Sequence, residues 1–315
     1  ICTLSRIEED KYMWLDGFTV RNLELVSGSS NESCTLFDIL DHTTTPMGAR
    51  LLHRWLAFPL KDVRPIRNRQ SVVEYLFRHP EDRDSIAEQL SGVQDMERIV
   101  SKISTGRIGP REMLQLAKAL RAIEKIKAIL SPIQTTGDNP YLALLESQLT
   151  PCEEMRQRIE HEIVPDPPIA QGRPNIIARG VDEELDNLRD IQHGGKEYLL
   201  KLQQREIEAT GIQSLKIGYN NVFGYFLEVR NTYKEQVPQA WIRKQTLANA
   251  ERYITPELKE YEETILSAEE KIQVIENRLY AQLMLDLCQY LSPLQIDANV
   301  LAQIDCLMSF ALVAA

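Results

Sequence analysis

Two long stretches of the chain place apolar side chains at a spacing that predicts paired helices. The first covers residues 181–202 and the second covers residues 258–279, and in both the step between seam positions alternates between three and four residues. This pattern is typical of a coiled coil. We therefore predict two long helices packed antiparallel, and a helix over residues 258–290 would be about 50 Å long at ~1.5 Å rise per residue. The seam positions are Val181, Leu185, Leu188, Gln192, Gly195, Leu199 and Leu202, and then Leu258, Tyr261, Ile265, Ala268, Ile272, Ile275 and Leu279.

The segment between these helices, residues 210–255, has a different pattern. Residues 215–219 and residues 222–229 are rich in aromatic and β-branched side chains, and Asn220-Asn221 lies at a turn between them. Two strand-forming runs on either side of such a turn predict a β-hairpin. We therefore expect a small β-containing module inserted at the far tip of the two helices.

The rest of the chain predicts a helical core. Thr45 is a candidate N-cap, Pro46 suits the first helical position, and apolar residues then repeat at helical spacing. Prolines and glycines within residues 164–180 predict a linker without a helix. Near the N-terminus, residues 18–20 and 23–26 predict short strands. Further helices are expected over residues 64–77, 93–103, 111–130 and 141–161.

The composition is that of a folded, mainly helical chain. Of the 315 residues, 43% are hydrophobic and 26% are charged, only 14 are glycine, and the net charge is −10. No apolar run approaches the ~20 residues of a membrane-spanning helix. The five cysteines are scattered without metal-ligand spacing, which predicts reduced thiols in a cytoplasmic protein. The chain begins at Ile1 without a methionine and stops in an apolar, helix-like run, so we expect a piece of a longer protein.

A search for chemical motifs finds no catalytic site in the sequence. It contains no phosphate-binding P-loop, no nucleophile elbow and no pair of histidines at metal-ligand spacing. Charge is more informative, because residues 196–259 hold ten Lys or Arg against seven Glu, and the rest of the chain carries −13. Residues 241–249 concentrate the side-chain types that contact phosphate. The module is therefore suited to a polyanion, although a surplus of three charges also fits an ordinary solvated surface.

Several longer motifs resemble the MutS family of DNA mismatch-repair proteins. Residues 44–60 (TTPMGARLLHRWLAFPL) are similar to the family's core-domain signature, and residues 21–25 (RNLEL) resemble its entry strand. Residues 218–226 look like the clamp hairpin, with Gly-Tyr-Asn at one end and Gly-Tyr-Phe at the other. Residues 245–253 and 256–262 resemble the segment that returns from the clamp. The motifs occur in the right order along essentially the whole chain, which makes the resemblance specific.

The resemblance implies the core (lever) and clamp domains of such a protein. We expect residues 1–195 to form the core and first lever helices, residues 196–256 the clamp, and residues 257–315 the returning lever helix and core. In the family, a mismatch-reading domain and a connector precede this region, and an ABC-type ATPase that also makes the dimer follows it. ATP and Mg²⁺ would therefore belong to the complete protein, and we expect no cofactor and no enzymatic activity in this part.

The resemblance also implies partners and a location. The expected partners are double-stranded DNA, a second copy of the complete protein in a homodimer, and a MutL-type repair protein. No membrane association is expected. The expected location is the bacterial cytoplasm, at the nucleoid during repair.

The clamp motif, together with the local positive charge, assigns candidate contacts to the DNA backbone. Cations would supply charge, and uncharged side chains would donate hydrogen bonds to phosphate oxygens. Ala248 stands where many relatives have Lys, so roughly one phosphate interaction would be lost. Residues 226–228 spell Phe-x-Glu, the form of the family's mismatch wedge, but they fall in the clamp, where we predict a strand without that role. The candidates are the cations Lys216, Arg230, Arg243 and Lys244 and the donors Gln245, Thr246 and Asn249.

Three alternatives stay open on the sequence alone. The chain also fits a MutS relative that acts on branched recombination DNA, because the discriminating wedge would lie outside it. It fits a helical scaffold whose tip binds a protein, which a lack of salt-dependent DNA binding would favour. The third alternative is an enzyme that works alone, which nucleotide hydrolysis by this chain would support.

Overall fold

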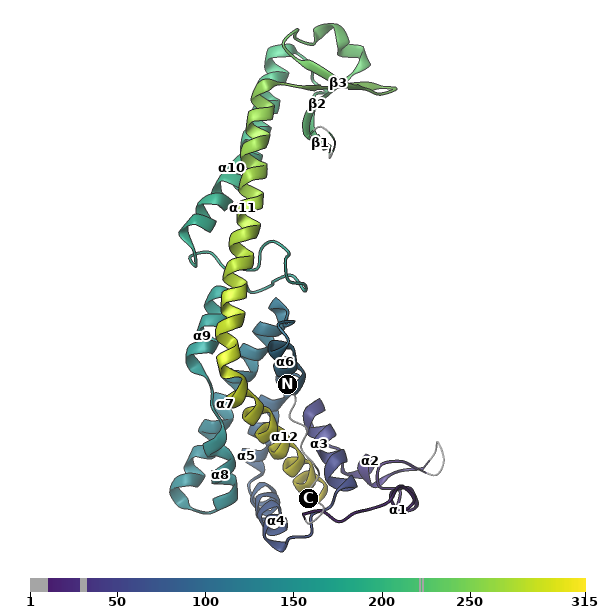
Figure 1. Cartoon of the computed structure of the whole chain (residues 1–315), viewed down its shortest axis with the longest axis vertical. Helices are drawn as coiled ribbons and strands as arrows, with labels where there is room; N and C mark the ends of the chain where they lie inside the picture. Colours follow the sequence, from purple (N-terminus) through teal and green to yellow (C-terminus); the bar gives the residue numbers. More distant parts are fainter. Residues whose placement is uncertain (1–10, 29–32, 221, 223) are drawn as a thin grey trace. The chain divides into compact units, whose positions relative to one another are not determined.

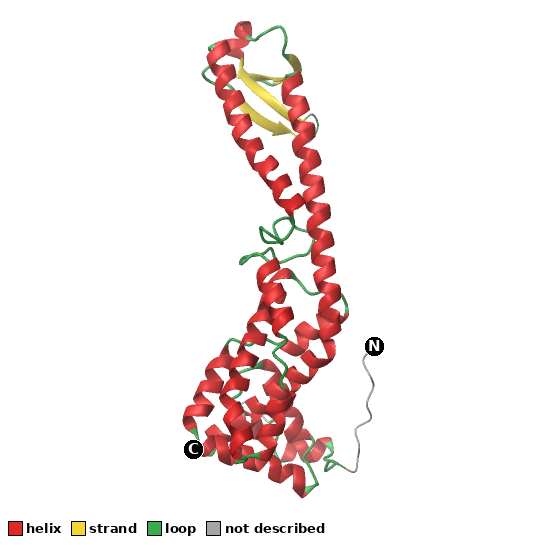
Figure 2. Ribbon diagram, turned by 90° about the vertical axis from the view of Figure 1, so that its left-hand side faces the viewer, coloured by secondary structure: helices red, strands yellow, loops and turns green. Residues whose placement is uncertain are grey.

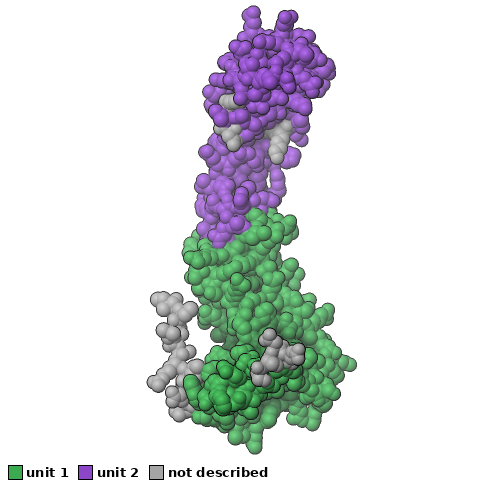
Figure 3. Space-filling model, turned by 90° about the vertical axis from the view of Figure 1, so that its right-hand side faces the viewer, with its two compact units in different colours: residues 1–169, 282–315 green, residues 170–281 purple. Residues whose placement is uncertain are grey.

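The computed structural model describes residues 11–28, 33–220, 222 and 224–315. The chain divides into two compact units, coloured separately in Figure 3. Unit 1 comprises residues 1–169 and 282–315, and unit 2 comprises residues 170–281. The described chain is mostly helical with one small antiparallel sheet, which confirms the predicted mainly helical class (Figures 1 and 2).

The described part of unit 1 is built from helices. The predicted start of helix α3 is confirmed, because the Thr45 hydroxyl accepts a hydrogen bond from the Gly48 amide and Pro46 occupies the first turn. The predicted linker is also confirmed, since no helix is found between Glu162 and Glu183. The elements are α1 (Gly17–Asn22), α2 (Leu36–Leu40), α3 (Pro46–Ala57), α4 (Val63–Arg78), α5 (Pro80–Ser91), α6 (Met96–Ser104), α7 (Pro110–Thr136), α8 (Pro140–Gln148), α9 (Glu153–Glu162), the 3₁₀ turn η2 (Cys288–Tyr290) and α12 (Leu291–Val313).

Helix α12 forms the centre of unit 1 and packs against α3, α4, α5 and α6. Its carboxylate Asp305 accepts hydrogen bonds from the Thr44 amide and from the amide and hydroxyl of Thr45, which holds the start of α3 against α12. Within Pro256–Val313, one 18-residue window has a mean hydropathy of 1.5, enough by length and composition to cross a membrane. However, 67% of that window is buried inside the protein, as in the core helix of a folded unit.

Three predictions in unit 1 were wrong, and helices α2 and α5 were not predicted. Residues 18–20 lie in helix α1, which Asp16 caps by accepting from the Thr19 amide, and residues 23–26 form no strand. The helix predicted over residues 141–161 is two helices, α8 and α9. They are separated near Pro151, which lacks an amide hydrogen, and Cys152, whose φ is 44°. Helix α5 was missed, although His79-Pro80 correctly ended the helix before it.

Unit 2 contains two long helices and the sheet. Helix α10 (Glu183–Thr210) covers the first predicted seam except Val181, which precedes the Asp182 cap. Helix α11 (Pro256–Leu287, of which residues up to 281 belong to unit 2) covers the second seam. Their side chains meet in pairs that run in opposite order along the two helices. Gln192 donates to Glu269 at 2.9 Å, the rings of Tyr198 and Tyr261 lie 4.3 Å apart, and Arg205 pairs with Glu257 at 2.6 Å.

A buried carboxylate joins both helices to the linker that precedes them. Glu276 of α11 is 1% exposed and accepts hydrogen bonds from the amides of Asn175 and Ile176, at 2.8 and 3.2 Å. It also pairs with Arg189 of α10, whose Nη2 lies 2.6 Å from the carboxylate. Buried charges are stable only when paired and hydrogen-bonded, so this cluster fixes the alignment of α10, α11 and the linker.

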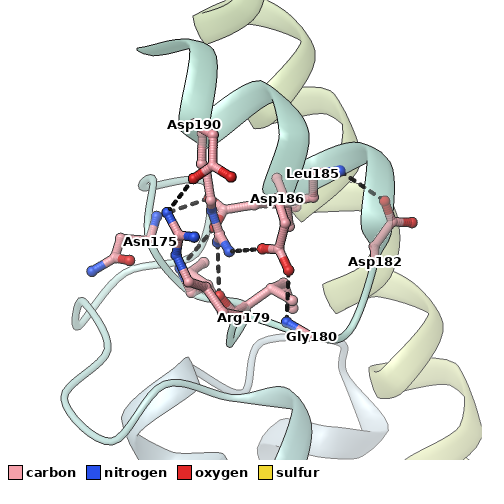
Figure 4. A network of polar contacts seen from close by, with 11 residues as sticks. Asn175, Arg179, Gly180, Asp182, Leu185, Asp186 and Asp190 are labelled. Atoms are coloured by element: carbon pink, nitrogen blue, oxygen red, sulfur yellow. Dashed lines mark hydrogen bonds and ion pairs between the residues drawn. The ribbon is translucent and has the colours of Figure 1, made fainter. Parts of the chain in front are cut away.

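The first turns of α10 carry further acidic side chains that hold the linker (Figure 4). Asp182 caps the helix, Asp186 accepts from the Gly180 amide at 2.7 Å, and Asp190 pairs with Arg179 at 2.9 Å. Negative side chains at a helix N-terminus also complement its dipole. The linker is therefore held by specific polar contacts although it contains no helix.

Candidate nucleic-acid interface

The module between α10 and α11 is a four-stranded antiparallel sheet with its own apolar core. The strands are β1 (Lys216–Asn220), β2 (Gly224–Arg230), β3 (Ile242–Thr246) and β4 (Ala250–Ile254), in the order β1-β2-β4-β3, with the 3₁₀ segment η1 (Asn231–Gln236) between β2 and β3. The predicted hairpin of β1 and β2 is confirmed, whereas β3 and β4 were not predicted. Asn221 of the predicted turn lies outside the described residues. The core residues are Leu202, Ile212, Leu215, Leu227, Val229, Trp241, Tyr253 and Leu258.

The sheet places the predicted contact residues on two different faces. Strand register aligns Lys216, Glu228, Arg252 and Gln245 in one row across all four strands. Because side chains alternate along a strand, Arg230 shares the face of that row. The opposite face carries Leu227 and Tyr253 of the core, and the register places Arg243 and Thr246 on it.

Arg243 forms an ion pair within the module. Its Nη1 lies 3.3 Å from Oε1 of Glu251, a side chain that is only 3% exposed. Lys234 of η1 reaches the same oxygen at 3.0 Å, and the Tyr253 hydroxyl donates to the other carboxylate oxygen. The hydrogen bond from Tyr253, together with those contacts, lowers the pKa of Glu251. The positive charge of Arg243 is therefore partly balanced before any ligand binds.

Lys244 stands at an irregularity of the edge strand. The register of β3 against β4 shifts between Arg243 and Gln245, so Lys244 is an extra residue in a β-bulge. It is exposed, and no described residue forms an ion pair with it, nor with Lys216 or Arg230. Bulges re-aim side chains. This one presents an exposed cation at the sheet edge, where Lys244 lines a pocket with Glu262 and Glu263 of α11.

The turn from β3 to β4 exposes the remaining candidate, Asn249. The turn is held from η1, because the Asn231 side chain donates to the Ala248 carbonyl at 3.0 Å and its amide donates to the Asn249 carbonyl at 3.2 Å. The Leu247 amide donates to the Ala250 carbonyl at 2.8 Å. The backbone of the turn is therefore fixed, and the exposed Asn249 side chain is left for contacts outside the chain.

The arrangement combines cations, amide donors and a fixed turn, which suits binding of phosphate oxygens. Within the described ranges, no group of three or more His, Cys, Asp or Glu side chains is placed to hold a metal ion.

Comparison with known proteins decides the family. Residues 18–311 match the family model of MutS domain III. The chain belongs to the MutS domain III family. It is 57% identical over 311 residues to the DNA mismatch repair protein MutS of Parabacteroides distasonis, and 55% identical over 314 residues to that of Bacteroides fragilis. It is 49% identical over 315 residues to the MutS of Flavobacterium johnsoniae.

These matches cover almost the whole of this MutS domain III chain but only part of each relative. They take in 99%, 100% and 98% of the chain, and 35%, 36% and 35% of the three relatives. The chain thus spans about a third of the length of the curated relatives it matches. The resemblance to the MutS family of DNA mismatch-repair proteins is confirmed.

Three residues that shape the candidate interface of this MutS domain III were not predicted from the sequence. Glu251 balances Arg243, Asn231 holds the β3–β4 turn, and Arg252 lies in the charged row. Each acts on a residue in another strand or turn. Only the register of a sheet that was not fully predicted would have revealed them, since no local motif signals such pairs.

Proposed function

We propose that this chain is the lever and clamp portion of a longer MutS protein of DNA mismatch repair, and that its sheet module grips the backbone of duplex DNA. The observation that carries the proposal is the set of exposed cations Lys216, Arg230 and Lys244, none of which forms an ion pair with a described residue, whereas Arg243 and Arg252 pair with Glu251 and Glu228. Phosphate oxygens are the matching ligands. Arg243 contributes part of its charge, and Gln245, Thr246 and Asn249 donate hydrogen bonds.

The grip is independent of DNA sequence. The candidate side chains lie on the two edge strands β1 and β3, at the end of β2 and in the β3–β4 turn. Cations and amide donors of this kind serve to bind phosphates. Contacts to phosphate position a protein on the duplex without carrying base information. Such a grip suits a protein that scans DNA before a mismatch is found.

In the same proposal, α10 and α11 are antiparallel levers that couple the clamp to an ATPase elsewhere in the complete protein. Residues 1–195 and 257–315 supply the core and levers, and residues 196–256 supply the clamp. The Glu276–Arg189 pair supports this role, because it ties both helices to the linker and lets them move together. ATP and Mg²⁺, the homodimer and a MutL-type partner belong to the complete cytoplasmic protein, and this part has no catalytic activity of its own.

The proposal is tested by reversing the unbalanced charges. Changing Lys216 and Lys244 to Glu should abolish binding of the complete protein to matched duplex at moderate salt, because two phosphate contacts become repulsive. Changing Arg243 and Lys244 to Glu should do the same. The matched control changes Lys118 and Lys125, two exposed lysines of α7, to Glu, with the same change of net charge and no expected loss. Unchanged affinity of the clamp variants at low salt would refute the assignment.

A further inference from the structure

Arg252 contacts three different side chains of the clamp sheet. Its Nε donates to Oε2 of Glu228 on β2 at 3.0 Å, and its Nη1 donates to Oε1 of Gln245 on β3 at 2.9 Å. Its guanidinium carbon lies 4.3 Å from the ring centroid of Phe226, which is itself 5% exposed. The Arg252 side chain is 21% exposed. One arginine of β4 therefore joins the two strands on either side of it.

The contact with Gln245 fixes the orientation of that amide. A guanidinium has only donors, so the side chain of Gln245 must turn its carbonyl oxygen toward Arg252. Its NH₂ group is then the end left to donate to another molecule. Without Arg252 the amide would be free to turn its acceptor outward, where a phosphate would repel it.

The contact also supports the strand that carries the exposed candidates. β3 is an edge strand that pairs only with β4, and its ladder is interrupted at the Lys244 bulge. The side-chain bridge from Arg252 to Gln245 lies directly after this interruption. It holds the register beyond the bulge, and with it the path into the β3–β4 turn.

The positive charge of Arg252 is paired within the sheet. Glu228 balances it, and one face of the guanidinium covers the Phe226 ring, which packs beneath Gly218 so closely that a Cβ at Gly218 would lie 2.7 Å from the ring. Lys216 lies in the same cross-strand row and forms no ion pair with a described residue. Of the two cations in the row, Arg252 is therefore already paired, whereas Lys216 remains available to a phosphate.

We propose that Arg252 is a positioning residue of the DNA interface, which orients the Gln245 amide and β3 toward phosphate without contacting phosphate itself. The inference rests on the proposed DNA-binding function. It assigns two roles to the cations of one sheet. Lys216 and Lys244 contact phosphate, whereas Arg252 orients the Gln245 amide and β3.

The first test asks whether Arg252 acts through Gln245. In the complete protein, R252K keeps the charge but loses the planar fork that reaches two partners. Binding to matched duplex should weaken roughly fivefold, the loss of about one hydrogen bond. The double variant R252K/Q245A should bind no more weakly than Q245A alone, because the two changes remove the same contact. Additive losses would overturn the proposal, as would full binding by R252K.

The second test asks whether Arg252 contacts phosphate. R252Q/E228Q leaves the net charge unchanged, and the slope of log affinity against log salt should equal that of the wild type. The matched control K216Q should reduce the steepness by about 0.9, the value for one phosphate contact. If R252Q/E228Q also reduces the steepness of the salt dependence by about 0.9, the positioning role of Arg252 is refuted and the proposed DNA binding still stands. If neither K216Q nor K244Q alters the slope, the proposed function fails and the inference fails with it.

Discussion

Replacing Asp297 by asparagine should stabilise unit 1, and the gain should grow with pH. Asp297 lies on α12 with no exposed surface, and its Oδ1 accepts from the Thr150 amide at 2.8 Å. Its Oδ2 has no hydrogen-bond partner among the described residues. Burial raises the pKa of Asp297 to about 7, against the hydrogen bond from Thr150 and the charge of Lys127. The charged form is thus disfavoured in the folded protein.

The sign and size follow from the two pKa values. An acid whose folded pKa is raised loses stability as pH rises from its unfolded value near 3.8 to about 7. At 1.36 kcal/mol per pKa unit, the full penalty is about 4 kcal/mol. Between pH 5 and pH 8 the free energy of unfolding of the wild type should fall by roughly 3 kcal/mol through this group. An asparagine has no charge to bury, so it avoids this loss.

The assay is denaturant unfolding at several pH values, with D305N as the matched control on the same helix. D297N should gain roughly 3 kcal/mol more over wild type at pH 8 than at pH 5. D305N should be destabilised by about 1–3 kcal/mol at pH 5, because its amide would face the donors of Thr44 and Thr45. Burial also raises the pKa of Asp305, so this loss should shrink as the pH rises. A stability difference between D297N and wild type that stays constant from pH 5 to pH 8 would refute the reasoning.

Three further changes test single contacts. E276A should cost roughly 3 kcal/mol in chemical denaturation, because Arg189 loses its more buried carboxylate partner and keeps only Asp186; a loss below about 1 kcal/mol would show that the pair is not structural. G48A should lower the thermal midpoint of unit 1, since a Cβ there would lie 2.2 Å from Oδ2 of Asp305; an unchanged midpoint would contradict that packing. G224A should cost about 1–3 kcal/mol in unfolding, because Gly224 has φ of 80°; a smaller loss would mean that the turn relaxes.

The helices were predictable because their signals are local. The Thr45 cap, Pro46 and the seam periodicity each act within a few residues, and α3, α10 and α11 confirm them. The strand predicted at residues 18–20 failed because Asp16 caps a helix over β-forming residues. Pro151 is a helix-breaking signal in the sequence, but the prediction of one helix over residues 141–161 ignored it.

The candidate site was less accessible to sequence, because its properties depend on pairs across strands. In the composition, Arg243, Arg252 and Lys244 are three equal positive charges. In the structure, Arg243 pairs with Glu251 and Arg252 pairs with Glu228. The bulge that exposes Lys244 appears only once β3 is aligned with β4. A net surplus of charge could not say which cations remain for DNA.

The most direct test of the central claim is binding of this chain to matched and mismatched duplexes across a range of salt concentrations. The account predicts affinity that falls steeply with salt, by about 0.9 in log slope for each phosphate contacted, and that is equal for the two duplexes. It further predicts that K216E/K244E removes this binding while K118E/K125E retains it. Absence of binding at low salt, or a clear preference for the mismatch, would contradict a sequence-independent clamp.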